Sequence, residues 1–139
     1  MTTKPRFMTV LAVSMVLALA GCRATPLQNV VDASYGSTAS ARALSLEDYR
    51  KAILRAGAKR KWVFTDAGPG HLIGNVNVRG KHEATVDVYF DTEQFSIRHQ
   101  SSRNLNYDAA NQTIHPNFNT WLRNLESDIR AEIQILRAT

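Results

Sequence analysis

The chain has 139 residues, of which 44% are hydrophobic and 21% are charged, with four histidines and one cysteine. This length fits one small domain plus a targeting segment and excludes two full domains. The formal charge of +5 includes Lys4 and Arg6, and the only later basic run is Lys59, Arg60 and Lys61. Because no nucleic-acid-binding motif accompanies this mild charge, we expect no nucleic acid partner.

Residues 1–21 have the three zones of a secretory signal peptide. A basic start precedes an apolar run from Phe7 to Ala20, and small residues stand directly before Cys22. The apolar run has about fourteen residues, fewer than the roughly twenty that a membrane-spanning helix needs. The pattern therefore predicts a cleaved leader and not a permanent membrane span.

The segment Leu19-Ala20-Gly21-Cys22 resembles the lipobox of bacterial lipoproteins. The resemblance implies that the Cys22 thiol receives diacylglycerol, that the leader is cut before it, and that a fatty acid such as palmitate acylates the new amine. The alternative is a chance cysteine in an ordinary secreted protein. As Cys22 is the only cysteine, no intramolecular disulfide is possible.

Three acyl chains bury enough methylene groups to hold a protein on a membrane. In lipoproteins of this kind an Asp after the cysteine commonly retains the protein at the inner membrane, and here the residue is Arg23. The resemblance therefore implies an outer-membrane anchor with the domain facing the periplasm. Possible partners are an envelope protein, peptidoglycan or a lipid headgroup.

Residues 22–43 are small and polar and predict a flexible tether that starts at lipidated Cys22. Its only apolar cluster is Leu27, Val30 and Val31. We expect a single α+β domain over residues 44–139.

The first element of that domain is a predicted helix over residues 45–57. Ser45 and Asp48 have capping-box spacing, Leu44 and Tyr49 occupy the staple positions, and Gly57 is placed to end the helix. Four runs of alternating apolar and polar residues follow, separated by turns that contain glycine or polar residues. The runs are 62–65, 72–78, 84–90 and 95–99. They predict an antiparallel meander of three to four strands with one buried face.

The last element is a long amphipathic helix that begins near Pro116. Its apolar residues recur at steps of three and four and are Phe118, Leu122, Leu125, Ile129, Ile133 and Leu136. Glu126 and Arg130 have the spacing of an ion pair within a helix. We therefore predict a two-layer α+β fold, with an N-terminal helix and this long helix on one face of the meander.

The stretch from Arg79 to Asn124 resembles a set of small proteobacterial outer-membrane lipoproteins whose activity is not settled. The likeness lies in Arg79 with His82 and in short segments that include Val86 to Asp91, Ser96 to Arg98, Ser102 to Tyr107 and Ile114 to Trp121. Phe118 and Pro116 stand where that family has a Tyr and a basic residue. The resemblance implies this location and fold. A looser architectural likeness is to the small lipoproteins of the outer-membrane barrel assembly machinery.

No catalytic, phosphate-binding or metal-binding motif occurs in the sequence. The histidines His71, His82, His99 and His115 lie on different predicted elements without metal-ligand spacing. We therefore expect no metal, no cofactor and no enzymatic activity.

Polar side chains gather before and within the start of the long helix, flanked by Tyr107 and Trp121. The candidate binding patch consists of Ser102, Asn104, Tyr107, His115, Asn117, Asn119 and Trp121. Two interpretations are open: a network that caps the helix, or a site that holds a polar ligand against aromatic rings. A hydrolase would need Ser102 as nucleophile, His115 as base and Asp108 to orient it.

These patterns predict a lipid-anchored, non-enzymatic binding or assembly module in the periplasm. The alternatives are an envelope hydrolase acting on peptidoglycan or lipid, and a structural homo-oligomer that pairs through an exposed strand edge.

Overall fold

The computed structural model describes residues 23–37 and 42–139. The predicted signal peptide, Cys22 and residues 38–41 lie outside the described residues. The elements in chain order are β1 (Thr25–Pro26), β2 (Val30–Ser34), α1 (Leu46–Lys59), β3 (Val63–Gly68), β4 (His71–Val78), β5 (His82–Phe90), β6 (Gln94–Arg103), β7 (Thr113–Ile114) and α2 (Pro116–Ala138).

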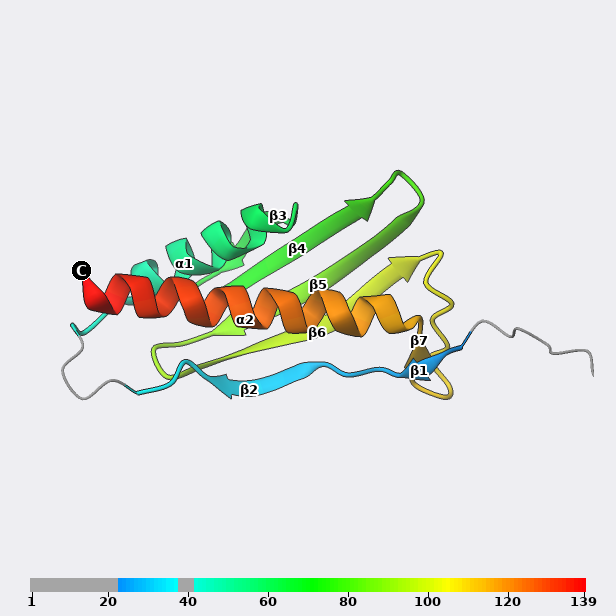
Figure 1. Ribbon diagram of the computed structural model, residues 1–139, viewed down its shortest axis with the longest axis horizontal. Coiled ribbons are helices and arrows are strands. Elements are labelled where there is room, and N and C mark those ends of the chain that lie inside the picture. The colour runs from blue at the N-terminus through cyan, green and yellow to red at the C-terminus, as the bar shows by residue number, and fades with distance from the viewer. Residues whose placement is uncertain (1–22, 38–41) are drawn as a thin grey trace, which may run out of the picture.

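Five strands form one antiparallel sheet in the order β2-β6-β5-β4-β3, and β1 pairs with β7 in a small second sheet. Both helices lie on the same face of the large sheet (Figure 1). The predicted two-layer α+β fold is therefore confirmed, and β3 to β6 form the predicted meander.

Helix α1 begins where its capping box predicts. The Ser45 side chain accepts the Asp48 backbone N–H, and the Asp48 carboxylate accepts the Ser45 backbone N–H at 2.9 Å. The prediction that Gly57 ends the helix is wrong, because the helix continues to Lys59. Gly57 is needed for contact with the sheet: a Cβ there would lie 2.1 Å from the Phe64 ring.

The core lies between the helices and the sheet. The predicted apolar stripe of α2 is confirmed, and Phe118, Leu122, Leu125, Ile129 and Ile133 are fully buried. The strand residues that alternate toward the helices are also fully buried, among them Leu72, Val86, Val88 and Ile97. One face of the sheet is therefore hydrophobic, as the period of two predicts.

The prediction of a flexible tether over residues 22–43 is wrong for residues 25–35, and the folded domain begins well before residue 44. Strand β2 pairs with β6, and Val30 and Tyr35 are buried in the core. The Tyr35 ring also packs against Tyr49, with ring centroids 4.5 Å apart. This segment folds because its few apolar residues reach a core formed by elements far along the chain, which local composition cannot reveal.

Candidate functional site

His115 and Asn117, both in the predicted binding patch, form the start of α2. His115 is the N-cap residue, and its Nδ1 accepts the Asn117 backbone N–H at 3.2 Å. Its own backbone N–H donates to the Leu105 carbonyl at 2.8 Å. An imidazole is an unusual cap, but it satisfies a helix N–H as a Ser or Asp oxygen does.

Asn119 is 4% exposed and fixes the N-terminal segment. Its Nδ2 donates to the Pro26 carbonyl at 2.9 Å and to Thr25 Oγ1 at 3.2 Å. Its Oδ1 accepts the Gln28 backbone N–H at 2.9 Å. All the polar atoms of this side chain are therefore used within the fold, and none is available to a ligand.

Ser102 and Tyr107 surround His99, whose importance the sequence did not reveal. His99 Nε2 lies 2.9 Å from Ser102 Oγ, and the Tyr107 ring is 4.1 Å away between centroids. The Phe118 ring meets the imidazole edge-on at 5.3 Å. Burial lowers the pKa of the His99 imidazole below its usual range, so the neutral form is favoured.

The other two predicted residues lie apart from each other. Asn104, in the left-handed region at φ 58°, donates from Nδ2 to the Lys81 carbonyl at 2.6 Å. Trp121 is half-buried and lines a hollow of about 150 Å³ together with Trp62 and Arg60. The seven predicted residues therefore do not converge on one site, and most of their hydrogen bonds hold loops, the helix start and the N-terminal segment.

The three residues of the hydrolase hypothesis also have separate partners. Ser102 bonds to His99, His115 caps α2, and the Asp108 carboxylate accepts from Asn111 and from the Ala110 backbone. The hydrogen bonds from Asn111 are the main cause of the lowered Asp108 pKa.

A different group of polar side chains lies on the sheet face opposite the helices, which we call the open face. In the described part of the chain neither helix covers it (Figure 1). It is formed by alternate residues of the strands, and its central members are His71, Ile73, Asn75, Thr85, Asp87, Tyr89, Arg98 and Gln100. Tyr89 is 45% exposed there.

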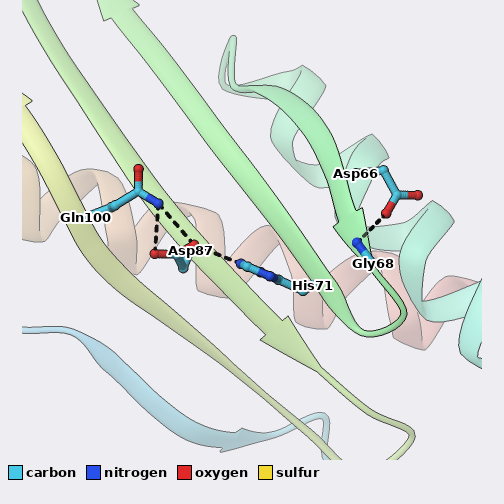
Figure 2. A network of polar contacts seen from close by, with 5 residues as sticks. All are labelled: Asp66, Gly68, His71, Asp87 and Gln100. Atoms are coloured by element: carbon cyan, nitrogen blue, oxygen red, sulfur yellow. Dashed lines mark hydrogen bonds and ion pairs between the residues drawn. The ribbon is translucent and has the colours of Figure 1, made fainter.

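A linked polar group occupies the centre of the open face. Figure 2 shows the His71 and Gln100 side chains pointing toward Asp87 from the strands on either side. His71 Nε2 lies 2.8 Å from Asp87 Oδ1, and Gln100 Nε2 donates to both carboxylate oxygens at 3.2 and 3.1 Å. The His71 ring stacks on Tyr89 with centroids 4.3 Å apart.

A β-bulge positions Gln100 in this group. Val86 pairs with His99 and Thr85 pairs with Ser101, so Gln100 is the extra residue of β6. A bulge of this kind redirects side chains locally, and here the amide reaches the Asp87 carboxylate. Figure 2 also shows Asp66 on the neighbouring edge strand, where its carboxylate accepts the Gly68 N–H at 2.9 Å. That bond, followed by the one from Arg50, lowers the Asp66 pKa.

Hydrogen-bonded pairs and shallow hollows extend the open face to both ends of the sheet. Thr85 Oγ1 donates to Asn75 Oδ1 at 2.7 Å, next to a hollow of about 330 Å³ that is also lined by Val63. At the other end Tyr89 and Ser96 line a hollow of about 200 Å³. The side chains are thus partly ordered by one another, and the two hollows lie at opposite ends of a broad polar surface.

The chemistry of the open face suits recognition. Asp87 can orient the imidazole of His71, as in acid–base sites, but neither residue lines the two hollows described above. Within residues 23–37 and 42–139, no group of three or more His, Cys, Asp or Glu side chains could hold a metal ion. Nor is any helix of this described part long and apolar enough to cross a membrane.

Comparison of the chain with protein-family models, with curated proteins and with solved structures finds no match.

Proposed function

We propose that the chain is a lipid-anchored lipoprotein of the bacterial cell envelope that binds a protein partner through the open face. The observation that carries the proposal is the asymmetry of the sheet. One face packs against both helices, while the other presents ordered polar side chains and the exposed Tyr89 ring. The lipobox-like segment before Arg23 supports the anchor.

A protein partner fits this surface better than a small molecule does. Small ligands are usually held in concave pockets that bury most of their surface, whereas the hollows on the open face are shallow. Protein interfaces favour tyrosine and arginine with a rim of hydrogen-bonding groups. Tyr89 and Arg98 lie on this face beside the His71, Asp87 and Gln100 group.

Site-specific photo-crosslinking in cells that make the lipidated chain tests the proposal. A photoreactive residue in place of Tyr89 should give one discrete protein adduct. The matched control replaces Ile135, which is 53% exposed on α2, and should give none. The partner identified in the adduct, once purified, should bind the wild-type chain and lose about tenfold or more in affinity with Arg98→Glu.

Arg55→Glu, an exposed charge reversal on α1, should leave that affinity unchanged. An adduct of two copies of this chain would favour the homo-oligomer instead. Equal adducts from positions 89 and 135, or equal losses with the two arginine variants, would refute the open face as the binding surface.

A further inference from the structure

Only a short connection joins Cys22 to the folded domain, which begins at Thr25. Thr25 pairs with Ile114, and the buried Asn119 amide holds both Thr25 and Pro26. Cys22 is joined to Arg23, so a lipid on Cys22 would start at most about 11 Å from the Thr25 backbone. A flexible tether of twenty residues would allow the domain to turn freely, but a connection this short restricts which end of the domain can meet the membrane.

Several other segments gather at the end of the molecule where the chain enters. Figure 1 places the turn between β4 and β5, the end of β6, the small β1–β7 sheet and the start of α2 at this one end. Hydrogen bonds connect these segments: His82 Nδ1 lies 2.8 Å from the Asn104 carbonyl oxygen, and Asn104 binds the Lys81 carbonyl. We call this region the anchor end and define its basic residues as Arg23, Arg79, Lys81 and Arg103.

The anchor end has an excess of positive charge, and all four of its basic residues are exposed. The nearby carboxylates are Glu83, which pairs with Arg103 at 2.5 Å, and Asp108, which is held by Asn111. In the described part of the chain, no ion pair neutralises Arg23, Arg79 or Lys81. The turn at the other end of the sheet, between β5 and β6, instead carries Asp91 and Glu93.

We infer that the anchor end lies against an anionic phospholipid surface, so that the domain stands on the membrane in one orientation. The short connection brings the three unpaired basic residues to the headgroups, and each basic residue near such a surface strengthens attachment about fivefold. The strands run from this end to the opposite one, so in this orientation they point away from the membrane. The open face is then roughly perpendicular to the membrane surface and remains accessible to a partner. The inference rests on the lipid anchor of the proposed function.

Depth measurements on the lipidated full chain test this orientation. Single cysteines replace Ala110, in the anchor-end loop before β7, or Thr92, in the opposite turn, and each carries a fluorophore. The chains are placed in vesicles of phosphatidylglycerol and phosphatidylethanolamine that contain a headgroup spin label. The label at position 110 should be quenched strongly and the label at position 92 hardly at all.

Charge reversal separates attraction by the surface from the constraint of the short connection. Arg79→Glu with Lys81→Glu should reduce quenching at position 110 to the level seen in neutral phosphatidylcholine vesicles, as should molar salt. The matched control, Arg42→Glu with Lys51→Glu, makes the same change of net charge away from the anchor end and should have no effect.

The mass of the N-terminal fragment shows whether Cys22 carries lipid, so a failure of the orientation can be told apart from a failure of the anchor. A lipidated chain with equal quenching at positions 92 and 110 would overturn the fixed orientation alone. If quenching at position 110 of the lipidated chain is the same with and without the charge reversal, the role of anionic lipid is overturned. A chain with no lipid on Cys22 would overturn both the orientation and the anchor of the proposed function.

Discussion

The polar side chains at the start of α2 and those on the open face both include imidazole and amide groups, but they differ in what their polar atoms bind. At the start of α2, the His115 imidazole accepts a backbone N–H of the helix itself, and the Asn119 amide binds backbone groups of the N-terminal segment. On the open face, His71, Asp87 and Gln100 bind one another and stay partly exposed. Side chains of the first kind stabilise the fold, whereas those of the second kind remain partly accessible to solvent, as the proposed binding surface requires.

The largest expected effect comes from Asn119→Ala, which removes the amide that holds the N-terminal segment. The Gln28 N–H and the Pro26 carbonyl lose a buried partner, so the free energy of unfolding should fall by about 2–4 kcal/mol. Urea unfolding measures the loss. Asn117→Ala is the control, because the Asn117 side chain is exposed and forms no hydrogen bond within the described residues. It should change stability by less than about 0.5 kcal/mol. Equal losses of stability in the two variants would show that the Asn119 side chain does not hold the N-terminal segment.

A smaller effect should come from acid acting on His99. Its folded-state pKa is lowered by burial, so the unfolded chain binds more protons than the folded chain as the pH falls below about 6.5. Stability should therefore be complete above pH 6.5 and decrease on acidification toward the folded-state pKa. Thermal unfolding between pH 7.5 and 5 should show this decrease in the wild type and a shallower one in His99→Gln. Parallel curves would mean that His99 is not the titrating group.

The smallest effect on stability is expected for Asp87→Asn on the open face. The His71 and Asp87 side chains are 25% and 17% exposed, so solvent still reaches the pair. Ion pairs near the surface contribute about 0–1 kcal/mol, and the free energy of unfolding should change by about that much. Binding of the crosslinked partner should nevertheless weaken clearly, because the neutral amide keeps only one acceptor oxygen and loses the charge that holds His71 and Gln100 in place. Glu126→Gln, which breaks the Glu126–Arg130 pair on α2, removes a similar carboxylate away from the open face and should leave binding intact. A large loss of stability in Asp87→Asn would place this group among the structural ones.

The sequence predicts the elements that have a strong local period. Alternation gives the four meander strands, and the three-and-four spacing gives α2 with its buried stripe. The strand β2 could not be predicted in this way, because it is short, contains Asp32 at φ 48°, and gains its partner β6 from far along the chain. Local composition made the same residues resemble a linker.

The candidate site could be predicted only in part, for a related reason. Alternation places Asp87 and Tyr89 on the polar face of their strand, which the sequence reveals. The contact of His71 with Asp87 depends on the register between β4 and β5, and that of Gln100 depends on a bulge in β6. In the same way, the burial of Asn119 depends on a segment that is 91 residues away from it in sequence. The cluster of polar residues predicted around the start of α2 therefore contains residues that make long-range contacts within the fold, and not residues of the open face.

The pairing of the N-terminal segment has a consequence for the order of folding. Thr25 contacts Ile114 across 89 residues and Asp32 contacts Ser96 across 64. Strand β1 therefore pairs only after β7 has been made, and β2 only after β6. Contacts of such high sequence separation form slowly, because loop-closure entropy is lost before they contribute. If the chain is exported from its N-terminus, as the proposed function requires, the β1–β7 pairing forms only after most of the chain has crossed the membrane.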